Sequence, residues 1–378
     1  MSNIDLVALL PFKLGFLGDA ESSDLDALVK ELKTEGIDAA VECREYPTNF
    51  SNVFNRELRV LEELEINCFT ISISYFGFGV GYIKAYRSLN VDETTKQTII
   101  KTTHLLWDEI SLQFSKNSRL FGLINSFVRS QSGISVDHGL SSLMTSPKLL
   151  DGFSQTLVSR AVNTSTKNKI FGKGYEKFEQ KTDLGSFVCL PAINLVVAER
   201  NRQKDILDIL SGATLNMALL YDIQSLNLKL SRQLLNKNSS VKTVEQNIDL
   251  FDDFVSSQNQ LIEEIKCEDF LGEDIEELIG RPLFKNWEMD ALIDRASQAI
   301  EHLSRQVDKA KDRIVRKAQR RQALFFLFFT VLTVLSVTAD ILGIYDFKNE
   351  LDSNARLAVM SAIFVISLFW ALFVFKER

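Results

Sequence analysis

The sequence predicts an α/β domain at the N-terminus, followed by long helices and a stalk helix that is continuous with the first of two transmembrane helices. Three observations support this fold class. Residues 286–345 contain no proline and a single glycine, Gly343, near the far end. At residue 323 the composition changes abruptly to ALFFLFFTVLTVLSVTA, and a second apolar run, LAVMSAIFVISLFWALFVF, occupies residues 357–375. The stalk is therefore expected to begin in water and end in a bilayer.

Composition excludes several classes of protein. The 378 residues carry a net charge of −7, which argues against nucleic acid as a direct partner. The four cysteines are widely spaced without a CxxC pair, so reduced structural thiols are expected rather than a zinc site. The three histidines stand apart from one another. No nucleophile motif, HExxH or complete phosphate loop occurs, so we do not expect an enzyme.

Residues 1–200 are expected to form the cytosolic α/β domain. Alternating apolar residues predict strands, and helical periodicity predicts helices. The expected strands are 4–10, ended by Pro11, then 37–43, a strand-turn-strand over 68–86, and a buried strand over 186–199. The expected helices are 23–35, 56–65 and 93–117. Residues 118–184 have only weak periodicity.

Three glycines in the 68–86 segment allow two interpretations. Gly77, Gly79 and Gly81 could belong to a phosphate-binding loop or to a hairpin. The spacing GFGVG fits neither a dinucleotide fingerprint nor a P-loop, because no GK[ST] follows. A glycine-bearing hairpin is the better explanation.

Residues 201–285 predict two long antiparallel helices. The first covers 201–236, where Ile and Leu recur at helical spacing. The second is expected to open at Thr243, with Gln246 as its capping-box partner, and is strongly acidic through residue 277. Its acidic side chains are interpreted as a solvated face, as a contact for a basic neighbour or as a divalent-cation surface. Residues 280–282 are expected to turn the chain into the stalk.

The stalk, residues 286–322, carries an apolar stripe at alternating spacings of three and four residues. Its members are Ile293, Ala296, Ile300, Leu303, Val307, Ala310 and Ile314. A stripe of this spacing serves two kinds of contact equally well. It packs on the helices before it in the same chain, or it forms a seam with the same helix of another subunit.

The two apolar segments, 323–345 and 357–375, are long enough to cross a hydrocarbon core of roughly 30 Å. Positive charges lie before the first span and in the tail, 376–378, whereas the linker, 346–356, is predominantly acidic. The positive-inside rule therefore predicts a multi-pass protein of the cell inner (plasma) membrane with both termini in the cytoplasm and the linker outside. The opening residues, MSNIDLVALLPF, contain no basic n-region and no signal-like hydrophobic core, so the first 300 residues are expected to stay cytosolic.

This order of elements resembles the CorA family of divalent-cation channels, most clearly over residues 201–378. That family ends its first span with Tyr-Gly-Met-Asn, often preceded by Gly-Ile. The corresponding point in this chain reads Gly343-Ile344-Tyr345-Asp346-Phe347-Lys348-Asn349. The acidic helix followed by basic residues before the membrane is also similar. The resemblance implies a homopentamer with a pore lined by the first spans.

The same resemblance assigns candidate site residues. The candidate pore-mouth residues are Tyr345, Asp346, Phe347, Lys348 and Asn349. Asp346, Phe347 and Lys348 occupy the place of the family's Gly-Met-Asn, whose asparagine binds the hydrated ion, or Asn349 does if the register shifts by one. A basic collar before the span comprises Arg313, Arg316, Lys317, Arg320 and Arg321. Because lysines at a pore mouth repel Mg²⁺, the expected selectivity is atypical.

Within the first span, Thr333, Ser336, Asp340 and Gly343 lie on one helical face and are the expected pore lining. An ionisable residue in a span usually faces water or a partner, so Asp340 is interpreted as part of a cation-attracting carboxylate ring; the alternative is an aspartate that snorkels to the interface. Phe325, Phe328 and Phe329 are candidates for a hydrophobic gate or for lipid-facing positions.

The expected function is an oligomeric CorA-like channel or transporter, gated by its cytosolic domain. Two versions remain open. One carries divalent cations, with Mg²⁺ as permeant or regulatory ion. The other resembles CorA-like membrane effectors of type III CRISPR antiviral defence, for which a small nucleotide second messenger would be the partner. The expected partners in both are the lipid bilayer and further copies of the chain. A membrane-tethered nucleotide-processing enzyme and a membrane scaffold are the alternatives from other classes.

Overall fold

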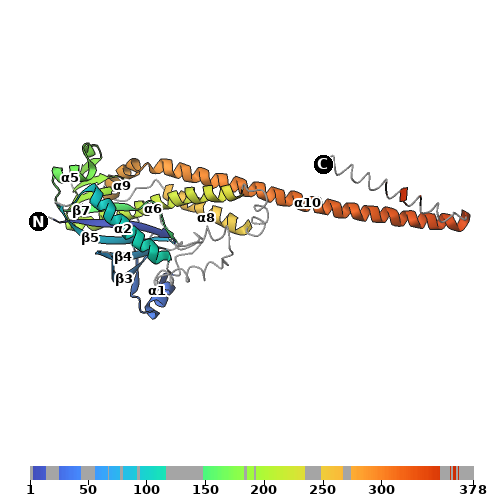
Figure 1. Ribbon diagram of the computed structural model, residues 1–378, viewed down its shortest axis with the longest axis horizontal. Helices are drawn as coiled ribbons and strands as arrows, with labels where there is room; N and C mark the ends of the chain where they lie inside the picture. Colours follow the sequence, from blue (N-terminus) through green and yellow to red (C-terminus); the bar gives the residue numbers. More distant parts are fainter. Residues whose placement is uncertain are drawn as a thin grey trace. The chain divides into compact units, whose positions relative to one another are not determined.

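A computed structural model of the chain describes most of its residues. The described ranges are 3–13, 25–43, 56–66, 68–76, 80–91, 94–115, 148–182, 185–190, 193–234, 248–266 and 274–349, together with 358, 361–362 and 365. The chain divides into two compact units, Met1–Val307 and Asp308–Arg378. The α/β domain and the helices that pack on it belong to the first unit (Figure 1).

The first unit is built on one mixed sheet. In the described residues its strands run in the order β2-β3-β4-β5-β1-β7-β10-β9-β8, and the short β6 pairs with β1. The strands are β1 (Asn3–Lys13), β2 (Ala39–Cys43), β3 (Arg56–Ile66), β4 (Phe69–Phe76), β5 (Val80–Asn90), β6 (Lys148–Leu149), β7 (Ser154–Ser159), β8 (Glu179–Thr182), β9 (Gly185–Cys189) and β10 (Ile193–Ala198). Neighbouring strands are antiparallel, except that β7 and β10 are parallel.

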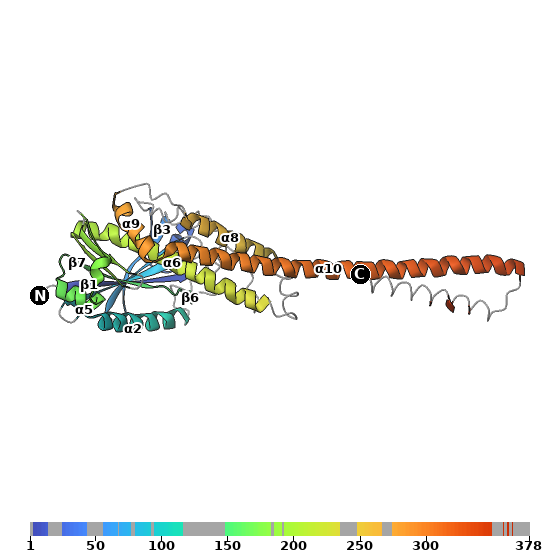
Figure 2. The same ribbon diagram turned by 90° about the horizontal axis from the view of Figure 1, so that it is seen from above.

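The sheet separates two hydrophobic cores because successive side chains of a strand point to opposite faces. In β1, Leu6, Ala8 and Leu10 belong to the core under α1 (Leu25–Thr34), α2 (Lys96–Ser115) and α5 (Thr164–Phe171). Val7 and Leu9 belong to the other core, which contains the long helices. Figure 2 shows α2 and α6 on opposite sides of β1, so the fold is a three-layer α/β/α arrangement.

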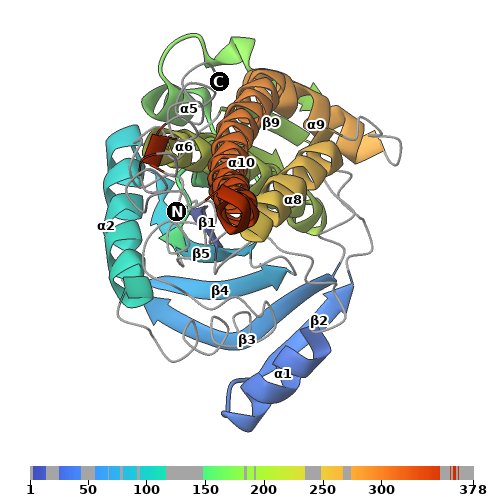
Figure 3. The ribbon, with the colours of Figure 1, turned by 90° about the vertical axis from the view of Figure 1, so that its right-hand side faces the viewer.

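Within the described ranges, the second face is covered by α6 (Arg200–Leu234), α8 (Ile248–Lys266), α9 (Asp274–Asn286) and the start of α10 (Met289–Asn349). Figure 3 shows α6, α8 and α9 gathered on the side of the sheet away from α1. The sequence prediction of an N-terminal α/β domain followed by long helices is confirmed. The expected helix over 201–236 and the helix over 93–117 correspond to α6 and α2.

Residues 56–65 were expected to be helical, and this prediction is wrong. They form β3, which pairs with β2 on one side and β4 on the other. The segment is rich in Glu, Leu and Arg, which favour helices, but Leu58 and Val60 also alternate with polar residues. Burial of Leu58 and Val60 in the sheet core outweighs the local preference.

Three further boundaries differ from the sequence prediction. β1 continues through Pro11 to Lys13. Residues 186–199 form two antiparallel strands, β9 and β10, instead of one. Residues 280–282 lie inside α9, and the chain turns instead at Glu288, whose φ is 53°. The capping box at Thr243 and residues 118–147 lie outside the described residues.

The hairpin interpretation of the glycine segment is confirmed by the pairing of β4 with β5. Gly81 is required by close packing: a Cβ there would lie 2.3 Å from the backbone oxygen of Ser74 and 2.5 Å from the ring of Phe12. Gly77 and Gly79 lie outside the described residues. The glycine at 81 therefore serves backbone approach within the sheet.

Candidate functional site

Helix α10 continues without a break from the predicted stalk into the predicted first span. From Ile293 to Val307 its apolar stripe is buried within the first unit, where Ile293, Ala296 and Ile300 join the core of α6 and the sheet. Of the two interpretations of the stripe, packing within the chain is therefore confirmed for this portion. Val315, beyond it, is 53% exposed.

The later half of α10 is apolar and exposed. Leu324, Phe325, Phe326, Phe328, Phe329, Leu332, Val334 and Val337 are between 38% and 70% exposed. None of the apolar segment of α10 is buried among the described residues, whereas 89% of the apolar segment of α6, which is also apolar enough to cross a membrane, is buried. α6 is thus a core helix of the domain, whereas the apolar half of α10 has no protein cover among the described residues.

The threonines of this half satisfy their hydroxyl donors inside the helix. Thr330, Thr333 and Thr338 each donate a hydrogen bond to the backbone carbonyl four residues earlier, at 2.6–2.8 Å. A helix in hydrocarbon must satisfy its polar groups internally. The hydroxyl oxygen of Thr333 still has lone pairs with which to accept a bond or to coordinate a cation.

Most of the predicted lining and gate residues share one helical face. Phe325, Phe329, Ser336 and Asp340 follow at spacings of four, seven and four residues, which returns the helix to nearly the same direction. The rings of Phe325 and Phe329 lie 4.6 Å apart, and Phe328 meets Phe329 edge-on at 6.2 Å. Thr333, Ser336 and Asp340 are exposed. Phe328 lies to one side of this face.

The structure describes only the backbone around the predicted pore mouth. Gly343 and the pore-mouth residues, 345–349, continue α10 as helix, so residues 346–349 of the expected linker are helical. Their side-chain surroundings lie outside the described residues, as does nearly all of the second apolar segment. The basic collar residues Arg313, Arg316, Lys317, Arg320 and Arg321 are exposed on α10 immediately before the apolar half.

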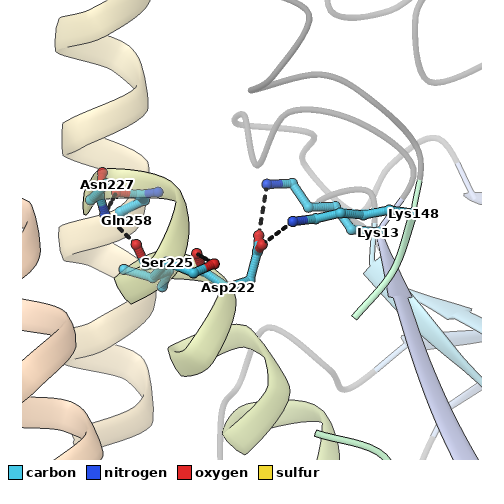
Figure 4. Close-up of polar contacts among 7 residues, drawn as sticks. Lys13, Lys148, Asp222, Ser225, Asn227 and Gln258 are labelled. Atoms are coloured by element: carbon cyan, nitrogen blue, oxygen red, sulfur yellow. Dashed lines mark hydrogen bonds and ion pairs between the residues drawn. The ribbon is translucent and has the colours of Figure 1, made fainter. Parts of the chain in front are cut away.

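A second candidate site lies in the first unit and was missed by sequence reasoning. Lys13, Lys148 and Asp222 come from β1, β6 and α6, and Figure 4 shows both lysine side chains ending at the carboxylate of Asp222. Lys13 Nζ lies 3.2 Å from Asp222 Oδ2, and Lys148 Nζ contacts Oδ1. The side chains of Lys13 and Asp222 are 1% and 4% exposed, whereas Lys148 is 39% exposed.

The strand register explains this convergence. Lys13 and Lys148 are direct partners in the β1–β6 pair, so their side chains leave the same face of the sheet. The backbone N–H of Leu150 donates to the carbonyl of Pro11 at 2.8 Å and holds the short strand in place. On the same face Lys84 pairs with Asp208 of α6 at 2.7 Å. Among the described residues, three ion pairs therefore join α6 to the sheet through two of its carboxylates.

Burial by itself would raise the pKa of Asp222, but the charges and hydrogen bonds of Lys13 and Lys148 outweigh it and lower the pKa. The carboxylate is therefore ionised in the folded protein at neutral pH. On the side of α6 that faces α8, the amide of Asn227 donates to Gln258 Oε1 at 2.8 Å (Figure 4). The sequence signal that could have identified Lys13 and Asp222 is a single charged residue within an apolar run. These runs read LPFKL and ALLYDIQ.

No metal-binding group of three or more His, Cys, Asp or Glu side chains occurs among the described residues. The divalent-cation interpretation of the acidic helix segment therefore gains no structural support from α8 and the described part of α9. Comparison with protein-family models, with curated proteins and with solved structures returns no match.

Proposed function

We propose that the protein is an oligomeric membrane channel or transporter of the CorA-like type, in which the α/β domain controls a pore formed by the apolar half of α10. The observation that carries this proposal is the change along one helix. Its first part is buried against the core of the domain, and its later part is apolar and has no cover among the described residues. In the proposed mechanism a change in the domain acts on the pore along α10, which continues from one part into the other as a single helix.

The face shared by Phe325, Phe329, Thr333, Ser336 and Asp340 supplies the chemistry of the proposed pore. When several copies present this face to a common axis, the phenylalanines form an apolar constriction, and the hydroxyls and carboxylates form a polar path. Repeated carboxylates attract cations. The expected ions are cations, with Mg²⁺ as a candidate, and the expected assembly by family resemblance is a homopentamer.

The basic collar supports the proposed orientation. Its exposed arginines and Lys317 precede the end of the span that the positive-inside rule assigns to the cytoplasm. The two versions of the function differ in what opens the pore. A transporter version responds to ions, and an effector version of the type III CRISPR kind responds to a small nucleotide.

The test is cation current through purified full-length protein in planar bilayers, with Mg²⁺, K⁺ and Na⁺ compared. We expect cation-selective current that Asp340→Ala reduces severalfold, because the carboxylate ring no longer concentrates cations. Asp312→Ala is the matched control, since Asp312 is an exposed aspartate of α10 outside the apolar half, and its current should equal that of the wild type.

A wild-type current that Asp340→Ala leaves unchanged would refute the pore assignment. If the wild type stays silent with ions alone and with added nucleotides, and the membrane-bound protein tolerates Asp340→Lys without a change in assembly, the scaffold alternative replaces the channel. Turnover of a nucleotide by the purified protein would favour the tethered enzyme.

A further inference from the structure

Every residue of the basic collar lies on one side of α10: Arg313, Arg316, Lys317, Arg320 and Arg321. Residues 313–322 are continuous helix, in which each residue turns the chain by about 100°. The basic residues therefore fall within an arc of about 140° around the helix axis. The remaining residues of the segment are uncharged and occupy an opposite arc of the same width: Ile314, Val315, Ala318, Gln319 and Gln322. All members of the collar are exposed, so this side of the helix is a charged surface.

The uncharged side of this segment continues into the proposed pore face. By the same rotation of about 100° per residue, Phe325, Ser336 and Asp340 fall within the arc that begins with Ile314. The centre of the collar lies about 150° from the centre of that face. When the pore face is turned to a common axis, the collar therefore points outward, away from the path of the ions.

The collar also lies at the depth of the lipid headgroups if the expected span begins at Ala323. At about 1.5 Å per residue, Arg320 and Arg321 precede the span by roughly 3–5 Å, and Lys317 precedes it by about 9 Å. The headgroup region adds about 5–8 Å to each side of the hydrocarbon core, and the long side chains extend the reach of their charges. Arg313, at about 15 Å, lies within a Debye length of that region.

The collar has no partner of opposite charge within the described part of the chain. Arg305, farther from the span, forms an ion pair with Glu301 one turn earlier in α10. Among the described residues, no such pair joins a carboxylate to a collar side chain. The collar thus presents only positive charge, and the partner that complements it is an anion outside these residues.

We propose that the basic collar binds the headgroups of anionic phospholipids in the cytoplasmic leaflet, through their phosphate oxygens. The inference rests on the proposed membrane insertion of α10, but not on ion conduction. Arginine binds phosphate through paired N–H donors and lysine binds it as a point charge. Because the collar occupies one side of the helix, bound lipid also restrains the rotation of α10 and keeps Asp340 turned away from the lipid.

The experiment uses full-length protein in vesicles of phosphatidylcholine that contain a trace of spin-labelled phosphatidylglycerol or spin-labelled phosphatidylcholine. The fraction of each label that the protein immobilises gives a preference ratio for the anionic lipid. We expect a clear preference for phosphatidylglycerol, which falls in high salt because the charges are screened. Arg320→Gln should lower the ratio by up to about five-fold, the effect of one basic side chain at a membrane surface, and Arg320→Lys should retain most of it.

Two matched variants separate a one-sided site at headgroup depth from a simple effect of net charge. Lys309→Gln removes an exposed lysine about 21 Å before the span, so its ratio should equal that of the wild type. Arg320→Gln/Gln322→Arg keeps the net charge and moves one charge to the uncharged side, and its ratio should fall as it does in Arg320→Gln. Light scattering in detergent checks the assembly of each variant. If the relocated variant disassembles, the comparison of Arg320→Gln with Lys309→Gln decides.

Equal immobilisation of the two lipids by the inserted wild type would overturn the inference and leave the proposed function standing. Equal losses in Arg320→Gln and Lys309→Gln would also overturn it, as would a full preference in the relocated variant that still assembles. Removal of the wild type from vesicles by alkaline carbonate would refute the membrane function, and the lipid site with it. A lipid preference in a protein that carries no current would count against the pore but support the lipid site.

Discussion

Replacement of Asp222 by asparagine is the most informative perturbation of the fold, because it removes the only described anion from beside two lysines. Lys13 is 1% exposed and would keep its charge without a partner. Breaking a buried ion pair in this way costs about 3–5 kcal/mol. Lys148 adds at most about 1 kcal/mol, since it is 39% exposed and solvent screens it.

The assay is thermal unfolding of the full-length protein in detergent, followed by tryptophan fluorescence. Trp287 lies in the core at 3% exposure and reports on the first unit. The expected fall in melting temperature is on the order of 5–15 °C for a unit of this size. The double variant Lys13→Met/Asp222→Leu should recover much of the loss, because it removes the unpaired charge and keeps apolar volume.

The pH dependence of stability is an independent test of the ion pairs of Asp222. The folded-state pKa of Asp222 is lowered, so its contribution to stability is present above the unfolded pKa near 3.8 and is lost as pH falls through the folded value. The wild type should therefore lose stability relative to Asp222→Asn only in strongly acidic solution. A fall of less than about 2 °C for Asp222→Asn at neutral pH, or no recovery in the double variant, would refute the argument.

Two further predictions concern the sheet and the cysteines. Gly81→Ala should destabilise the protein by about 1–3 kcal/mol or more, because the new methyl meets the Ser74 backbone oxygen at 2.3 Å; Ser88→Ala, at an exposed position of the same strand, should be neutral in the same melting assay. Burial raises the pKa of Cys189 to about 12, whereas Cys68 is exposed. Peptide-resolved maleimide labelling at pH 7 should therefore modify Cys68 in the folded protein and reach Cys189 only after unfolding, and equal labelling rates would contradict the burial of Cys189.

The local sequence was enough to predict the elements whose periodicity allows only one secondary structure. The uninterrupted helix near residues 286–345 is confirmed as α10, since no proline or clustered glycine interrupts it. The strand pair around Gly81 and the helices α2 and α6 follow from alternation and from helical spacing. The apolar character of the later half of α10 is also evident from composition, because no charged residue lies between Arg321 and Asp340.

Only the tertiary structure decided which surface each apolar pattern meets. β3 has helix-forming residues, yet pairing on both sides makes it a strand. α6 and the later half of α10 are both apolar enough to cross a membrane, and burial alone separates them. The meeting of Lys13, Lys148 and Asp222 depends on register between segments far apart in the chain. The periodicity of a sequence indicates which face of an element is apolar. What that face packs against is decided by contacts between residues that are distant in the sequence.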